Sequence, residues 1–315
     1  VLYVKRVTEV KSRIANQNTT YAGTVRNVPG TYATLTAAYT AAANGDIIQL
    51  ADGTYNMASE SGGYWLVNTS TKGVLVRGNA ANPAAVKLTC SSAAYGIRMR
   101  DCAAMTFQDL TIESTGSAVA TYMDQPYSSK WLKFKNVIFS KTTSAKWLFE
   151  RTSLTTDTNS IWIEFDGCTF NMPVDQDIIK YANTGINETM LITNCTFNKT
   201  DATGVYAVLS YLSSHKGKLA VYNSTLNTVK SVKIIQLGED EAVPTNTTFN
   251  VDIRNASLNY TGTYSGHAML VGRGTTKIYC VNNTITMPAV SDPLAIGMVI
   301  KTASANFVII LLLAI

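Results

Sequence analysis

The sequence predicts an all-β fold, a single-stranded parallel β-helix (a solenoid) with an N-terminal capping α-helix. Three observations predict it: a strand–turn–strand phrase that recurs seven times, a further short strand between successive copies, and one amphipathic helix ahead of the first copy. A repeat of about 20 to 50 residues is typical of solenoids, propellers and arrays, in which each unit buries its apolar face by stacking on a neighbour.

The N-terminal elements fit the closed end of such a solenoid. Residues 33–43 are expected to be helical, and the pair Asn44-Gly45 then stops the helix. An apolar strand over 46–50 and a turn over 51–55 follow. The residues that share the apolar face of the helix are Leu35, Ala38, Tyr39 and Ala42. A helix at this place would cover the core and the strand edges that an uncapped first coil exposes.

The repeated phrase carries a bend-tolerant residue at its third position. The first copy spans 107–112 and the last spans 280–285, and the third positions are 27, 31, 27, 29, 32 and 27 residues apart. Every one is Asn, Asp or Gly, the residues that enter the left-handed backbone region at least cost. We therefore expect a bend at one shared corner of each coil, with stacked amide side chains forming a structural ladder. These residues are Asp109, Asn136, Gly167, Asn194, Asn223, Asn255 and Asn282.

A second set of strands lies between the copies. Each coil then holds about three strands of 3 to 6 residues, whereas a propeller blade needs four strands and about 40 residues or more. Leucine-rich repeats would show their own leucine spacing and helices. A parallel β-helix remains. The expected strands cover residues 96–100, 119–123, 147–150, 178–181, 207–211, 232–237, 268–271 and 297–300.

The order of a capping helix, Gly45-Asp46, an apolar strand and Gly53-Thr54-Tyr55 resembles the first coil of the pectate-lyase-like superfamily. The resemblance covers roughly residues 28–300. It implies a right-handed parallel β-helix. Enzymes of that superfamily cut acidic or neutral polysaccharides, either by lyase chemistry with Ca²⁺ and an Arg or Lys base, or by hydrolysis with paired carboxylates.

The sequence offers no persuasive set of catalytic residues for either reaction. Asp175 and Asp177 follow Pro173 and are better interpreted as part of a turn, and the acidic run 239–241 lies in a Gly- and Pro-flanked loop. Gly266-His267 departs from the Gly-His-Gly motif of polygalacturonases, because the next residue is Ala268. No register carries acidic residues in three coils, as Ca²⁺ would require. We therefore expect no catalytic residues, no metal site and no cofactor. This expectation favours a protein that is not an enzyme.

One group of charged residues could form a basic groove for an anionic glycan. It begins on the strand expected over 96–100 and continues on later coils. Ordinary solvated strand faces remain the alternative interpretation. The candidate glycan-binding residues are Arg98, Arg100, Asp101, Arg151 and Lys180.

Composition narrows the class of protein. The 315 residues are 46% apolar and 15% charged with a net charge of +5, and no basic run is interleaved with aromatics, so nucleic-acid binding is not expected. The five cysteines lack zinc-ligand spacing and are interpreted as buried free thiols. Ten Asn-x-Ser/Thr sequons would make a glycoprotein only in a cell that glycosylates. Four of the ten are by-products of the repeated corner.

The two ends suggest self-association. The chain begins at Val1, from which we expect a removed leader or a longer parent product. The run 307–315 is nine apolar residues, too short for a membrane span of about 20 and expected to be a covered terminal strand. We expect a homo-oligomer or filament built through the terminal strands.

These observations divide the chain into four parts: an N-terminal arm and oligomer contact (1–30), a capping helix (31–45), a β-helix of about nine coils (46–300) and an apolar C-terminal strand (301–315). They favour a non-catalytic structural or adhesive subunit of a surface filament or virion appendage, which is extracellular, self-associating and able to bind a surface polysaccharide. The alternative is a polysaccharide lyase or hydrolase, or a phage tailspike-type depolymerase. Fold alone does not separate the two.

Overall fold

The structure is a computed structural model of the whole chain. It describes residues 21–60, 62–68, 72–91, 95–99, 104–116, 119–124, 131–142, 148–152, 161–174, 176, 178–182, 187–201, 207–212, 216–229, 233–237, 249–260, 267–271, 275–286, 298–300 and 308–312.

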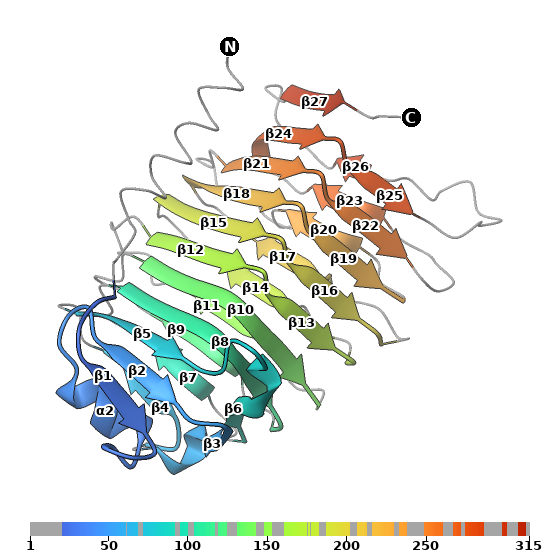
Figure 1. Ribbon diagram of the computed structural model, residues 1–315. Helices are drawn as coiled ribbons and strands as arrows, with labels where there is room; N and C mark the ends of the chain where they lie inside the picture. The colour runs from blue at the N-terminus through green and yellow to red at the C-terminus, as the bar shows by residue number, and fades with distance from the viewer. Residues whose placement is uncertain are drawn as a thin grey trace.

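The chain forms an all-β, single-stranded parallel β-helix, which confirms the predicted fold class. Strands of successive coils lie side by side from the blue N-terminal end to the red C-terminal end in Figure 1. Most coils give two consecutive strands to one large sheet and a third strand to a smaller sheet. All pairings recorded between the described strands are parallel, as expected when each coil repeats the path of the one before it.

Within the described residues the large sheet has 18 strands. They are β1 (Val25–Val28), β2 (Ile47–Leu50), β3 (Gly53–Asn56), β5 (Gly73–Arg77), β6 (Val86–Cys90), β8 (Ala104–Ser114), β10 (Trp131–Lys141), β12 (Ile161–Asp166), β13 (Thr169–Met172), β15 (Asn187–Thr193), β16 (Thr196–Lys199), β18 (Lys216–Tyr222), β19 (Thr225–Thr228), β21 (Phe249–Arg254), β22 (Ser257–Tyr260), β24 (Thr275–Val281), β25 (Thr284–Thr286) and β27 (Val308–Leu312).

The small sheet has nine described strands, and it contains each strand that was predicted between the repeated phrases. Only β4, in the first coils, was not foreseen. The strands are β4 (Trp65–Val67), β7 (Tyr95–Met99), β9 (Val119–Asp124), β11 (Phe149–Thr152), β14 (Ile179–Ala182), β17 (Leu209–Leu212), β20 (Lys233–Leu237), β23 (His267–Val271) and β26 (Met298–Ile300).

Helix α2 (Leu35–Ala41) packs at the N-terminal end, as predicted, although it is shorter than the expected 33–43. Its apolar face joins the hydrophobic core. Glu60 accepts hydrogen bonds from the backbone N–H groups of Leu35 and Thr36, both at 3.1 Å, which satisfies free donors of the first turn. Lys72 donates to backbone carbonyls at the other end of the helix, including that of Ala42 at 3.1 Å.

Two details of the first two coils differ from the prediction. The expected turn over 51–55 contains β3, because after Gly53 at φ 150° the chain extends and pairs with β6. Two 3₁₀ turns, Met57–Ser59 and Pro83–Ala85, also interrupt the path between strands. Pairing with the next coil outweighed the local turn preference of Asp52-Gly53.

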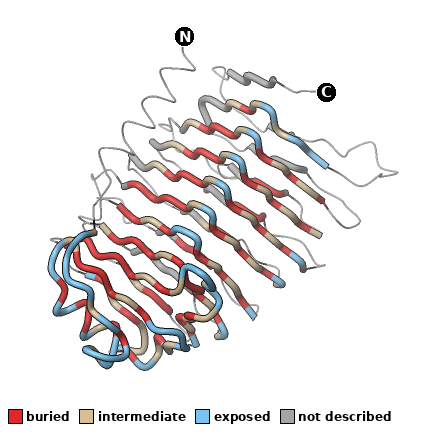
Figure 2. The backbone as a smooth tube through the Cα atoms, in the orientation of Figure 1, coloured by how far each residue is buried: buried red, intermediate tan, exposed pale blue. Residues whose placement is uncertain are grey.

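Phenylalanine rings stack from coil to coil inside the solenoid. The ring centres of Phe134 and Phe165 are 5.1 Å apart, and the angle between the two ring planes is 9°. The ring centres of Phe170 and Phe197 are 4.4 Å apart, and their planes differ by 4°. Such pairs add about 0.5–1.5 kcal/mol each beyond the area that they bury. Figure 2 shows the buried positions continuing along successive strands, so the core runs through the stack of coils.

The apolar run near the C-terminal end contains β27, which pairs with β24 as the next strand of the large sheet. Of the described helices, none is long and apolar enough to cross a membrane.

Candidate functional site

The structure places all seven corner residues of the repeated phrase in the left-handed backbone region. Their φ angles run from 50° at Asn223 to 64° at Gly167. The bend lies between the two strands that each coil gives to the large sheet, for example between β15 and β16 at Asn194. The backbone requirement therefore explains the residue types at this position.

Side-chain hydrogen bonds link the corner residues at only some steps. The amide of Asn136 donates to Asp109 Oδ1 at 2.8 Å, and the amide of Asn255 donates to Asn223 Oδ1 at 3.2 Å. Next to Gly167, which offers no side chain, Asn194 donates instead to Asp166 Oδ1 at 3.1 Å. The left-handed backbone conformation thus repeats in every coil of the corner, whereas side-chain hydrogen bonds join only some of the coils.

A second asparagine ladder lies on the outward face of the strands after the corner, and the sequence reasoning missed it. Three successive amides, from Asn198, Asn227 and Asn259, donate to the asparagine of the preceding coil, each at 3.0 Å. The ladder starts at Asn171 and runs through β13, β16, β19 and β22. The signal was present, because an Asn follows the large apolar residue of four consecutive copies.

The candidate glycan-binding residues are only partly brought together. Arg98 on β7 and Lys180 on β14 occupy one register column of the small sheet, through Tyr122 and Glu150 on the strands between them. Both alternate with buried residues and so face outward. Arg151 belongs to the neighbouring column. Its side chain, like the whole of Arg100 and Asp101, lies outside the described residues.

Two tyrosines hold the Arg98 guanidinium. Its carbon lies 4.8 Å from the ring centre of Tyr95 and 5.7 Å from that of Tyr64, and Nη1 donates to the Tyr64 hydroxyl at 3.3 Å. The two rings meet edge to face at 5.7 Å. A cation over aromatic faces gains about 0.5–1 kcal/mol at exposed sites. Together these three side chains form a half-exposed cationic and aromatic surface, which suits an anionic ring-shaped ligand.

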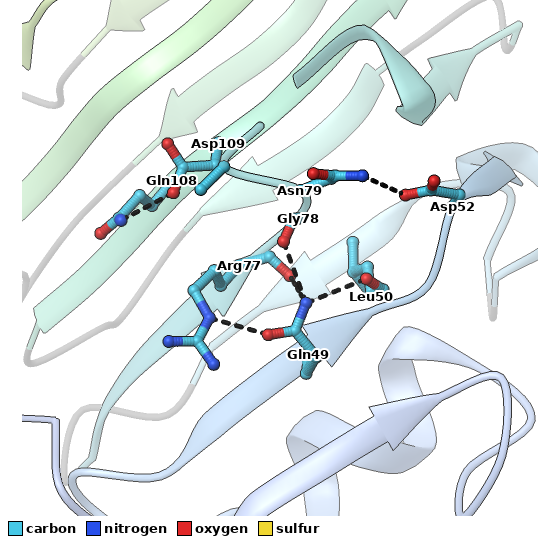
Figure 3. A pocket seen from close by; sticks show the side chains of 9 residues that line it. Gln49, Leu50, Asp52, Arg77, Gly78, Asn79, Gln108 and Asp109 are labelled. Carbon is cyan, nitrogen blue, oxygen red and sulfur yellow. Dashed lines mark hydrogen bonds between the residues drawn. The ribbon is translucent and has the colours of Figure 1, made fainter. Parts of the chain in front are cut away.

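A polar pocket of about 470 Å³ lies at the corner of the first coils (Figure 3). It forms where the chain leaves β2 and β5 and passes the corner of β8. Its lining combines two carboxylates with one guanidinium and three amides. The lining residues are Gln49, Leu50, Asp52, Arg77, Gly78, Asn79, Ala80, Gln108 and Asp109.

The pocket's polar groups are hydrogen-bonded mainly to one another, as Figure 3 shows. Arg77 Nε donates to Gln49 Oε1 at 2.7 Å, and Asn79 donates to Asp52 Oδ1 at 2.9 Å. Gln108 donates to Asp109 Oδ2 at 2.8 Å, so with Asn136 on Oδ1 both oxygens of that carboxylate are engaged. These bonds hold the side chains in place and occupy atoms that a substrate would need.

Gly78 lets the pocket's two corners approach closely. A Cβ at this position would lie 2.3 Å from the backbone oxygen of Asp109 and 3.1 Å from the Cβ of Val86. A larger residue would push β5 and its following turn away from β8. The position of the Asp109 carboxylate relative to the first coils therefore depends on this glycine.

The thiols that the structure describes are buried and free, as predicted for Cys90, Cys168, Cys195 and Cys280. Burial raises the pKa of Cys90 to about 12 and that of Cys280 to about 11, and it also raises the pKa of Cys168. Thiols with such pKa values are poor nucleophiles and poor metal ligands. Among the described residues, no group of three His, Cys, Asp or Glu side chains is placed to hold a metal ion.

Comparisons with known proteins give no family and one distant structural likeness to report. No family model matches the chain, and no curated protein matches it. Among solved structures the chain is similar to pectin methylesterase PemA from Erwinia chrysanthemi, with a TM-score of 0.42 and 12% sequence identity over 87% of this chain and 92% of that one. At a TM-score of 0.42 this likeness carries no conclusion about the fold, the activity or the residues of this chain.

Proposed function

We infer that this protein is a non-catalytic, extracellular β-helical rod, a structural or adhesive subunit of a surface filament or virion appendage. The observation that carries the proposal is the continuity of its stacking. Phenylalanine stacks and the strand asparagine ladder link coil to coil, so the coils resist bending and local opening together. A stiff, closely hydrogen-bonded rod suits a part exposed to proteases on a cell or virion surface.

The adhesive part of the proposal rests on the outward face of the small sheet. Arg98 with Tyr64 and Tyr95, and Lys180 in the same register column, combine positive charge with aromatic rings. Sugar rings stack on aromatics, and carboxylate or sulfate groups pair with guanidinium and ammonium groups. We propose an acidic polysaccharide as the ligand of this face.

Binding without turnover is the test. Retention on immobilised polyuronate should weaken about tenfold in the Arg98→Ala variant, the loss expected for one charge-assisted contact of about 1.4 kcal/mol. Lys87→Ala is the matched control, because Lys87 is a half-exposed lysine on the outer face of the large sheet. Equal retention of both variants, or release of reducing ends or unsaturated uronate by the unaltered protein, would contradict the proposal.

One specific observation favours the alternative, a polysaccharide-processing enzyme. Asp52 and Asp109 line the same pocket with Arg77, and paired carboxylates across a groove are what glycoside hydrolysis uses. Asp109→Asn separates the two functions, since Asn occupies five of the other six corners at similar φ and should preserve the fold. Hydrolysis of any polysaccharide that disappears in this variant would favour the enzyme.

A further inference from the structure

A regular polar face lies on the outside of the large sheet, on the strands that follow the corner. β13, β16, β19, β22 and β25 lie side by side there (Figure 1). Each of the first four strands turns two half-exposed side chains outward, alternating with buried residues, and β25 continues the same register. We call the ten outward residues the Thr/Asn face: Thr169, Asn171, Thr196, Asn198, Thr225, Asn227, Ser257, Asn259, Thr284 and Thr286.

The Thr/Asn face consists of two columns that run along the stack of coils. The first column holds a hydroxyl side chain in every coil, from Thr169 to Thr284, and these hydroxyls make no hydrogen bond with any residue that the structure describes. A threonine side chain has few χ1 rotamers, because it is branched at Cβ. The second column is the strand asparagine ladder, whose amides hold one another at 3.0 Å. The face therefore presents fixed rows of hydroxyl and amide groups to water.

The aromatic rings directly beneath this face show that the coils stack with little twist. The ring centres of Phe139 and Phe170 are 4.7 Å apart, and their planes differ by 3°. From Phe170 to Phe197 the separation is 4.4 Å and the angle 4°. Since Phe170 and Phe197 lie between the two outward residues of β13 and β16, the columns above them are close to straight. Four steps of about 4.8 Å then make the face about 19 Å long.

The Thr/Asn face is uncharged, whereas the surfaces next to it are charged. In the first coils the same two columns carry Lys87 and Glu113, whose charged atoms are 3.8 Å apart. The outward column just before the corner carries Lys135, Asp166 and Arg254. None of the ten residues of the face is charged or aromatic. A charged ligand would find no opposite charge there, and a sugar ring would find no aromatic ring to stack on. An uncharged, repeating array of hydrogen-bonding groups is the ligand that this face fits.

We propose that the Thr/Asn face binds ice. Neighbouring oxygen atoms in ice are separated by the ordinary O–H···O distance of about 2.8 Å, and tetrahedral bonding then places second-neighbour oxygens about 4.5 Å apart. The spacing of about 4.8 Å between coils exceeds this by about 0.3 Å. Over four steps the mismatch reaches about 1.2 Å, which is less than half of one O–H···O distance. Each hydroxyl of the first column can therefore hold a water molecule close to an oxygen position of the ice surface.

Rigid side chains and the absence of charge both favour this binding. The water molecules of ice cannot rearrange around a protein as liquid water does, so the protein must supply the matching geometry. Side chains that are already fixed lose less entropy on binding than mobile side chains lose. A charged group would lose hydration against ice, because the lattice cannot reorient around an ion. Bound protein makes the growing ice front curve between neighbouring molecules, which lowers the temperature at which the crystal grows.

Uptake of the full chain into slowly growing ice tests the proposal. The unaltered protein should be enriched in the ice, and its solution should show a gap between the melting and growth temperatures of a single ice crystal. Thr225→Glu, at the centre of the face, should lower the ratio of protein in ice to protein in liquid about tenfold, because the new charge loses hydration. Thr196→Glu, one coil away, should act similarly. Thr54→Glu is the matched control and should keep full uptake, since Thr54 is exposed in the same column but opposite Lys87 in the charged first coils. Thermal melts confirm that each variant is folded.

The remaining outcomes identify other occupants. Exclusion of the unaltered protein from ice, or equal uptake of all the variants, would overturn the proposal. Retention on cellulose, or a dimer in sedimentation, that Thr225→Glu abolishes while ice excludes the unaltered protein would overturn it in favour of a neutral polysaccharide or a second copy. The Arg98→Ala variant should keep full uptake, because Arg98 lies on the small sheet. Ice binding can therefore fail or succeed independently of the polyuronate binding proposed above.

Discussion

The two asparagine ladders of this protein use the same residue for different physical reasons. At the corner, each residue sits at φ between 50° and 64°, and side-chain bonds join only some coils. On β13, β16, β19 and β22, the strands are extended, and every successive pair of amides is bonded at 3.0 Å. At the corner, Asn is favoured because the backbone is left-handed there. On the strands, Asn is favoured because its amide bonds to the amides of the neighbouring coils.

This difference explains what each position tolerates. A backbone requirement can be met by Asn, Asp or Gly, and all three occur at the corner. A side-chain ladder needs a group that both donates and accepts, which Asn provides and Asp and Gly do not. The strand ladder holds Asn alone from Asn171 to Asn259.

The largest expected effect is at the corner. Asn223→Val should lower the free energy of unfolding by about 2 kcal/mol or more, because a β-branched residue is strained at φ 50° and the bond to Asn255 is lost. Chemical denaturation measures it. Asn223→Gly keeps the backbone and should recover most of the loss. If the Val and Gly variants unfold at the same denaturant concentration, the left-handed backbone conformation does not determine which residues the corner tolerates.

Acid should distinguish the capped end from the strand ladder. Burial acts to raise the pKa of Asp46, but hydrogen bonds from the backbone of Ala43 and Thr24 and from Arg26 outweigh it and hold that pKa below its ordinary value. Stability from Asp46 is therefore complete above about pH 4 and is lost as the pH falls further. The bonded amides of the strand ladder do not titrate in this range.

Hydrogen exchange measured on the two regions checks this prediction. Between pH 7 and pH 5, protection of β1 and β2 should be constant once intrinsic rates are removed, and below about pH 4 it should fall ahead of β16 and β19. In the Asp46→Asn variant, the free energy of local opening of β1 at neutral pH should fall by about 1–2 kcal/mol, because an amide cannot replace the charged acceptor. Uniform loss along the rod would show that the coils open as one unit.

The same change in the strand ladder should cost less than at the corner. Asn198→Val removes two amide bonds, but the position is half-exposed and extended, where Val is favourable and water can replace the lost partners. We expect a loss of less than about 1 kcal/mol, measured beside Asn223→Val under the same conditions. A cost at Asn198 equal to that at Asn223 would remove the distinction between the ladders.

The smallest effect is expected at the one glycine corner. Asn at position 167 would keep φ 64°, and the nearest atom to its Cβ is the backbone nitrogen of Asn136 at 4.0 Å. Gly167→Asn should change the unfolding free energy by less than about 0.5 kcal/mol, in either direction. Gly167→Ala is the control and should cost about 1–2 kcal/mol, because Ala lacks the local hydrogen bonding that eases the left-handed region. Thermal melts of the two variants give the comparison.

The fold followed from the sequence because its causes are local and repeated. The sequence of each coil contains an apolar face, a left-handed corner and a short strand. The spacing of about 29 residues between copies predicts that the coils stack. The cap was foreseen for the same reason, since four apolar residues shared one face of a helix. The turn over 51–55 was predicted wrongly, because pairing of β3 with β6 is a contact between coils that local propensity does not contain.

Which residues meet at the candidate sites depends on the register between strands of successive coils. The sequence predicts that register only approximately. Arg98 and Lys180 share a column, whereas Arg151, which seemed part of the same group, falls in the neighbouring one. The polar pocket was not foreseen, because Gln49, Arg77 and Gln108 meet only once three coils are aligned. Loops of unequal length lie between those coils, so counting residues does not give the alignment.

The sequence by itself determined the period of the coils, the corner, the apolar interior and the capped end, because each is written within one repeat and follows from backbone preference and burial. The tertiary structure decided which asparagines bond into a ladder, which charges share a face, and that two tryptophans outside the main core are buried. Those features join residues about 27 to 32 positions apart, and only the registration of one coil on the next brings them within hydrogen-bond distance.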